Sequence, residues 1–203
     1  MAIRKKRDRT QEQLDQLRDI RGQAAASIPA LEDALRSTSN YVVAKVAAII
    51  EDEALRQMTS QLLAAFDRFM PDAPRIDKGC AATTAIVKAL SALDYRDPAP
   101  YRRGIRHHQN EGLGPIDVAT ELRGACAMGL AQTNDDRAMD ELVLLLTDSE
   151  APARLSAARA IGCRNDATGI PVLMLKVHLG DREVEVLAEC MASILAISLT
   201  QRT

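Results

Sequence analysis

The segment ARLSAARAIG, residues 153–162, decides the fold because related segments occur before and after it at one constant 31-residue step. Its first two positions, Ala153 and Arg154, align with Leu122 and Arg123 before and with Val184 and Glu185 after. Apolar positions deeper in the segment recur as Cys126, Ala157 and Ala188, and as Leu130, Ile161 and Ala192. A fixed period of this length is typical of stacked helix pairs. We therefore expect an all-α protein.

The rest of the chain gives apolar spacing that fits helices throughout. Leu142 and Leu173 repeat the same step in the segments that connect the copies, as do Asp135 and Asp166. Runs of alternating β-branched or aromatic residues are missing from the sequence, so we expect no strands. The expected helices cover residues 11–20, 28–36, 41–52, 54–70, 76–93, 118–131, 137–146, 152–161, 170–179 and 184–195, and residues 101–109 are expected to form a short irregular helix.

The segment Asp94–Ile116 interrupts the period. The comparable step from Lys78 to Arg123 is longer than the later ones, and the extra length is rich in proline and glycine. We expect an irregular insertion there, followed by a helix for which Asp117 is the N-cap. Gly162 is expected to end the helix that Pro152 begins.

Two segments carry a resemblance to a known family. ELVLLLTD, residues 141–148, followed by ARLSAARAIG, resembles the HEAT-like repeats, particularly the short form found in bilin-lyase-like proteins. The match is strong over Asp117–Ile197 and weaker over Ile28–Leu93, and the last copy has Glu185 in place of the opening arginine. The resemblance implies an α-α superhelix (solenoid) of about five helix pairs, with one irregular repeat. Residues 1–22 would form a basic arm with an amphipathic helix, and residues 23–203 a single HEAT-like domain interrupted by residues 94–116.

Composition narrows the classes of function. The chain has 47% hydrophobic and 27% charged residues, with three Tyr, two Phe and no Trp, so few flat surfaces are available for stacking bases or sugars. The net charge of −2 gives no bulk attraction to nucleic acid. Residues 1–116 hold 18 basic and 15 acidic side chains, whereas residues 117–203 hold 8 and 13. No apolar run is long enough to span a membrane.

Four cysteines, Cys80, Cys126, Cys163 and Cys190, lie far apart without a CxxC pair. We expect them to be reduced and buried as small apolar residues, which favours a cytoplasmic location. No metal or other cofactor is expected. The di-iron HEAT-like hydroxylases use His-Glu pairs, and no His-Glu dipeptide occurs here.

The strongest local concentration of charge is YRRGIRHHQ, residues 101–109. Guanidinium groups bind phosphate or carboxylate through paired hydrogen bonds, and imidazole titrates near neutral pH. Helical spacing would place Arg102 and Arg106 on one face. The candidate residues for binding a partner or an anion are Tyr101, Arg102, Arg103, Arg106, His107 and His108. The alternative is that these arginines cap helix ends or pair with acidic residues of the repeats.

A second candidate surface is the concave side that the inner helices would form. Its candidate residues are Thr84, Lys88, Arg123, Arg154, Arg159 and Glu185, of which Thr84, Lys88 and Arg159 are expected to be exposed to a partner. Repeats of this kind imply interaction rather than reaction. We therefore expect a non-catalytic scaffold that holds another protein on the concave face or at residues 94–116.

Two other classes of function stay open. One is a module that binds nucleic acid or another anion through Arg102, Arg103, Arg106 and the basic leader Arg4–Arg9. The other is a HEAT-like enzyme of the bilin-lyase or DNA-glycosylase type. We find no catalytic constellation: the sequence has no nucleophile-elbow motif, and it lacks most of the aromatic residues that the glycosylases use.

Overall fold

The computed structural model describes residues 10–17, 27–114 and 116–201, and the chain forms two compact units. Unit 1 consists of residues up to Tyr95 together with Gln109–Val118, and unit 2 consists of Arg96–His108 together with the chain from Ala119 onward. The basic leader Arg4–Arg9 lies outside the described residues. The prediction of one HEAT-like domain over residues 23–203 stays a prediction.

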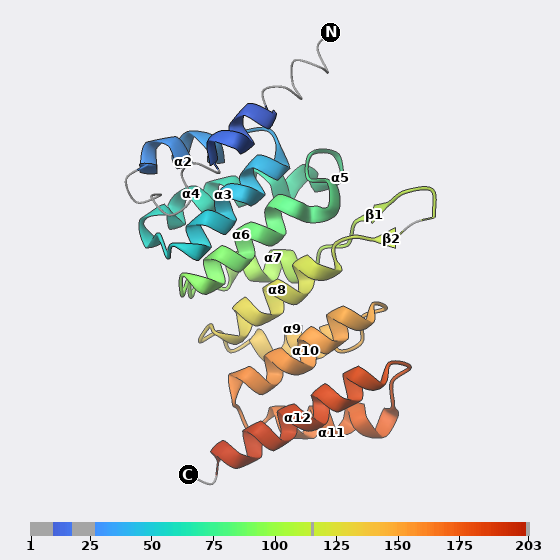
Figure 1. The fold of residues 1–203 in the computed structure, drawn as a ribbon. Helices are drawn as coiled ribbons and strands as arrows, with labels where there is room; N and C mark the ends of the chain where they lie inside the picture. The colour runs from blue at the N-terminus through green and yellow to red at the C-terminus, as the bar shows by residue number, and fades with distance from the viewer. Residues whose placement is uncertain (1–9, 18–26, 115, 202–203) are drawn as a thin grey trace. The chain divides into compact units, whose positions relative to one another are not determined.

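Unit 1 is built mainly of helices, as the sequence predicted (Figure 1). Helix α3 packs against both α2 and α6, and α4 packs against α6. Their shared core includes Val46, Ile50, Phe66 and Ile86, each at most 1% exposed. After a helix over residues 10–17, the elements are α2 (Ile28–Leu35), α3 (Asn40–Asp52), η2 (Arg56–Met58), α4 (Thr59–Phe69), η3 (Met70–Asp72), α5 (Ala73–Ile76), η4 (Lys78–Cys80), α6 (Ala81–Ala92), β1 (Asn110–Glu111) and β2 (Ile116–Asp117).

The irregular segment contains a short antiparallel hairpin, so the prediction that no strand would form is wrong. Strands β1 and β2 pair Asn110 with Asp117 and Glu111 with Ile116. Gly112 has φ of 87°, a value that glycine adopts without steric cost, and it allows the turn. The N-cap position of the next helix is Ala119 and not Asp117, which lies two residues earlier in this hairpin and accepts a hydrogen bond from the Gln109 amide. That helix begins at Thr120.

Unit 2 is an ordered series of helix pairs (Figure 1). Helices α8, α10 and α12 lie side by side in that order, and α7, α9 and α11 pack against α8, α10 and α12 respectively. The elements are α7 (Ala99–Ile105), α8 (Thr120–Ala131), α9 (Ala138–Leu145), α10 (Ala151–Arg164), α11 (Gly169–Leu179) and α12 (Val184–Thr200). None of the described helices combines the length and apolar composition needed to cross a membrane.

The constant step of the sequence holds from α8 to α10 but not from α10 to α12. Helix α8 begins at Thr120 and α10 at Ala151, as the period requires, whereas α12 begins at Val184, two positions later than the period would place it. Longer helices account for the difference: α11 has 11 residues where α9 has 8, and shorter turns offset only part of the excess. The alignment of Arg154 with Glu185 is therefore wrong, and Leu187 occupies the equivalent place.

Gly162 does not end its helix, contrary to the prediction. Helix α10 continues to Arg164, and Asn165 in the left-handed conformation follows it. A Cβ atom at Gly162 would lie 2.5 Å from the Ser193 hydroxyl oxygen. The glycine thus allows α10 and α12 to approach closely.

Candidate functional site

Tyr101 anchors the arginine-rich segment in the interior of unit 2. Its side chain is fully buried, and its ring occupies the space that a Cβ atom at Gly129 would need, 2.3 Å away. A buried ring cannot contact a partner directly. The prediction that Tyr101 belongs to a binding surface is therefore wrong: the residue fixes α7 against α8.

Arg102 and Arg106 point to the same side of α7, as helical spacing predicted. Arg102 forms an ion pair with Asp135, and Arg106 forms a two-pronged pair with Glu141, including an Nε to Oε2 distance of 2.8 Å. Glu141 is only 6% exposed, and its partnership raises the pKa of Arg106 through hydrogen bonding and charge attraction. These pairs connect α7 to α9 and to the turn before α9. Both arginines therefore pair with acidic side chains of the neighbouring elements, which is the alternative to a binding role that the sequence left open.

A cavity of about 590 Å³ lies between α7 and α9. We call it the arginine groove. Arg103 and Arg137 are exposed, and Leu144 beside them is 63% exposed despite being apolar. The lining residues are Arg102, Arg103, Arg106, Arg137, Asp140, Glu141 and Leu144. Four guanidinium groups face the carboxylates of Asp140 and Glu141, and Asp135 pairs with Arg102, which leaves an excess of one positive charge.

The two histidines lie where the chain passes from α7 to the hairpin. The His107 carbonyl oxygen accepts a hydrogen bond from Arg123 Nη1 at 3.0 Å, which ties this segment to α8. His107 is half-buried and His108 is exposed. Within the part of the chain that the structure describes, no group of three or more His, Cys, Asp or Glu residues could hold a metal ion.

Arg123 and Arg154 are structural residues inside unit 2. Arg123 is fully buried and binds both carboxylate oxygens of Asp148 at 2.8 and 3.0 Å. Arg154 binds both oxygens of Asp181 at 2.7 and 2.6 Å, and its Nη1 donates to the carbonyls of Asp148 and Ser149. Both guanidinium groups therefore bind partners within unit 2, and neither is available to another protein as the prediction of concave-face residues required.

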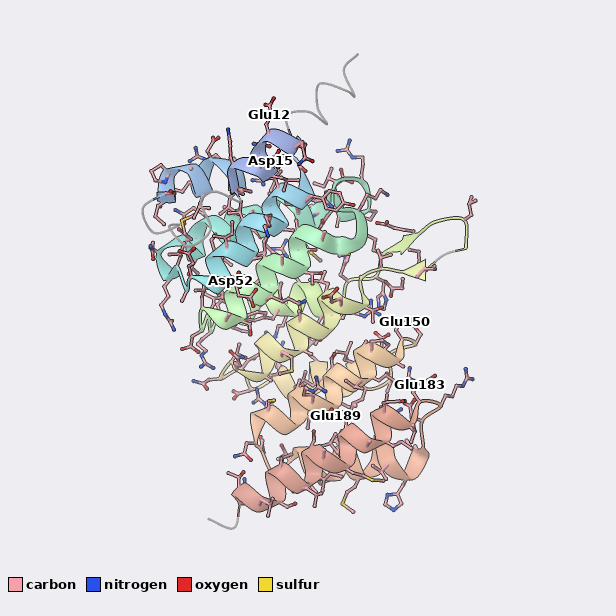
Figure 2. The ribbon with its side chains drawn as sticks, viewed as in Figure 1. Glu12, Asp15, Asp52, Glu150, Glu183 and Glu189 are labelled. Atoms are coloured by element: carbon pink, nitrogen blue, oxygen red, sulfur yellow. The ribbon has the colours of Figure 1, made fainter. Side chains whose placement is uncertain are left out.

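The two aspartates are positioned by the turns in which they lie. Asp148 Oδ1 accepts the Glu150 amide at 2.8 Å, and Asp181 Oδ1 accepts the Glu183 amide at 3.0 Å. Figure 2 labels Glu150 and Glu183 at these turns, which precede α10 and α12. Hydrogen bonds from Arg154 are the main cause of a pKa for Asp181 well below its usual range. The sequence does not predict these partners, although Asp148 is the last residue of the segment ELVLLLTD.

The remaining predicted concave-face residues differ in exposure. Thr84 is only 7% exposed, so the prediction that it is available to a partner is wrong: it faces the interior of unit 1. Lys88, Arg159 and Glu185 are exposed. Arg159 pairs at 2.8 Å with Glu189 of α12, the residue labelled in Figure 2, a contact within unit 2.

All four cysteines are free, and three of them are buried. Burial raises the pKa of the Cys126 thiol, and it raises the pKa of Cys190 to about 11. Both thiols therefore stay protonated at neutral pH and act as apolar side chains. Cys163 is exposed, so the prediction of burial is wrong for that residue.

Comparison with known proteins adds no family to this description. No family model matches the chain, and no curated protein sequence matches it significantly.

Proposed function

We propose that this protein is a HEAT-like repeat scaffold that binds an acidic segment of another protein in the arginine groove. The helix-pair order of unit 2 supports the repeat interpretation, because α8, α10 and α12 each pack against the next and each has its own partner helix. Repeats of this kind present long, rigid surfaces, and their usual role is binding.

The arginine groove is the observation that carries the proposal. Arg102 and Arg106 are held in place by Asp135 and Glu141, so their positions are fixed before a ligand arrives. Preorganised guanidinium groups bind carboxylates through paired hydrogen bonds at low entropic cost. Exposed Leu144 beside them would contact an apolar residue of the same partner segment. An acidic peptide that contains an apolar residue satisfies both features.

The ion pairs of Arg102 and Arg106 make these two arginines poor sites for testing the groove. Replacing Arg102 or Arg106 would leave Asp135 or the buried Glu141 without its guanidinium, so a loss of binding would be confounded by damage to the fold. Arg103 and Arg137 are exposed and line the same groove, so the double variant Arg103→Ala/Arg137→Ala tests the site itself. Arg182→Ala is the matched control, since Arg182 is an exposed arginine that lies outside the groove.

A fluorescein-labelled peptide of alternating glutamate and leucine is the first probe, with fluorescence anisotropy as the readout. We expect the wild type and Arg182→Ala to bind it equally and Arg103→Ala/Arg137→Ala to bind at least tenfold more weakly. Equal binding by all three proteins would contradict the proposal.

A single-stranded oligonucleotide of equal charge tests the nucleic-acid alternative. Tighter binding of the oligonucleotide than of the peptide, with a steep dependence on salt, would favour that alternative instead. Affinity purification from the native cell with the same three proteins then identifies the physiological partner.

A further inference from the structure

Helix α12 carries an apolar stripe on the side that faces away from α10. Val184 is 68% exposed, Met191 51%, Leu195 63% and Leu199 64%. With the exposed Ala188 and Ala192 they form one face, because their spacing of three, four and seven positions returns to the same side of a helix. We call these six residues the outer α12 stripe. The opposite side is buried on α10, where the Ser193 hydroxyl donates to the Ala158 carbonyl at 3.1 Å.

The equivalent face of α10 is covered by a helix, α12, which indicates that a helix can also cover the outer α12 stripe. When α10 and α12 are aligned at their first residues, Ala158 corresponds to Met191, Arg159 to Ala192 and Gly162 to Leu195. These three residues of α10 are in contact with α12: Ala158 and Gly162 meet Ser193, and Arg159 pairs with Glu189. The outer α12 stripe is thus the equivalent of a helix-packing face, with apolar residues where α10 has Arg159 and Gly162.

The spacing of the stripe is symmetric about a point between Met191 and Ala192. Val184 and Leu199 lie equally far from that point, and so do Ala188 and Leu195. Two copies of α12 packed antiparallel about a two-fold axis would place Val184 against Leu199 of the other copy. Ala188 would face Leu195 in the same way, so that a large side chain meets a small one at that position.

From this symmetry we propose that the outer α12 stripe binds the same stripe of a second copy of this chain, antiparallel and two-fold symmetric. Exposed apolar faces of this extent mark interaction sites in soluble proteins. Stable dimers bury about 800 Å² per partner, and one helix face lies at the low end of that size. We therefore expect dimerisation in the micromolar range. The proposal uses a different face from the arginine groove, so either can fail without the other.

Sedimentation velocity of the full chain, from low micromolar concentrations to a hundredfold higher, tests the association. We expect the mass to rise from 22.1 kDa towards twice that value. Leu195→Glu should weaken association at least 100-fold, because it places two desolvated carboxylates in the interface. Leu175→Glu is the matched control, since Leu175 is similarly exposed, at 59%, but lies on α11 and outside the stripe. Circular dichroism establishes that both variants keep the wild-type helix content.

A wild-type chain that stays monomeric at the highest concentration would overturn the proposal, and so would equal weakening by Leu175→Glu. The antiparallel arrangement has its own test in a Cys163→Ser background, which removes the exposed native thiol. Val184→Cys chains mixed with Leu199→Cys chains should form a disulfide between the two kinds of chain. Disulfides between two Val184→Cys chains would instead show a parallel pairing and overturn the arrangement proposed here.

Discussion

Asp77 in unit 1 and Asp148 in unit 2 both lie a few residues before a helix, α6 and α10 respectively, but have different partners. Both carboxylates accept backbone amides of the residues that follow them, Ala82 and Thr83 for Asp77 and Glu150 for Asp148. The side-chain donors to Asp77 are the Asn40 amide at 3.2 Å and the Thr83 hydroxyl at 2.8 Å, whereas the side-chain donor to Asp148 is Arg123. A buried carboxylate before a helix is therefore bound by neutral groups in one unit and by a cation in the other.

The difference shows what arginine adds. Asn40 reaches Asp77 and the Lys78 carbonyl, which lie in one turn. Arg123 reaches both the Asp148 carboxylate and the His107 carbonyl, so one guanidinium connects three separate segments of unit 2. The planar fork of arginine makes this possible, but a fully buried cation depends on its carboxylate far more than an amide does.

Asp148→Ala should have the largest effect on stability. It leaves the fully buried Arg123 without its counter-charge, and we expect a loss of about 3–5 kcal/mol in the free energy of unfolding. Urea denaturation followed by circular dichroism measures it. The double variant Arg123→Met/Asp148→Ala should be more stable than Asp148→Ala alone, because it removes the unpaired charge. If the double variant is the less stable of the two, the interpretation of the pair is wrong.

Asp181→Asn should cost about 2 kcal/mol at pH 7, because it leaves Arg154, which is 11% exposed, with only carbonyl partners. The pKa of Asp181 is lower in the folded state than the ~3.9 of an unfolded aspartate, so its contribution is fully present above that value. The contribution is lost as the pH falls through the folded-state pKa. The difference in the free energy of unfolding between wild type and variant should therefore shrink as the pH falls from 4 to 2, without reaching zero. A constant difference would contradict the assigned shift.

Asn40→Ala should cost less, about 1–2 kcal/mol, since Asp77 keeps its bonds to the Ala82 amide and to Thr83. Asn40→Asp is the informative companion, because it places a second carboxylate beside Asp77 and should destabilise unit 1 more than alanine does. Thermal unfolding of both variants at pH 7 gives the comparison. A ranking with aspartate above alanine would contradict the expected repulsion between the two carboxylates.

Arg103→Ala/Arg137→Ala should have the smallest effect, within about 0.5 kcal/mol of the wild type, because both side chains are exposed. The same urea titration applies, with Arg182→Ala as the reference. A loss well above that size would show that these arginines contribute to the fold as Arg123 does, and that the arginine groove is not available to a ligand.

The sequence predicted the helices of unit 2 well because their apolar spacing is local. It did not predict the partners of Arg123 and Arg154, because Asp148 and Asp181 follow them at unequal distances along the chain, beyond the next helix and its turns. The sequence does not predict the burial of Tyr101 either. Its ring occupies space that is available only because Gly129 of another helix lacks a side chain.

The same limit explains two further differences. The hairpin was missed because strands this short leave no alternation to detect. A constant 31-residue period places Glu185 at the position of Arg154. The period fails there because α11 is longer than α9 by almost one helical turn.

The links between turns in unit 2 also set the order in which its helices can open. Asp148 binds Arg123 through its carboxylate and Arg154 through its carbonyl, so this turn is attached to both α8 and α10. If α11 and α12 separated together from α10, the ion pair between Arg154 and Asp181 would break, but the Asp148 turn would stay bound to Arg123. Amide protons of α12 should therefore exchange with solvent faster than those of α10, with α8 and α10 exchanging as one cooperative group.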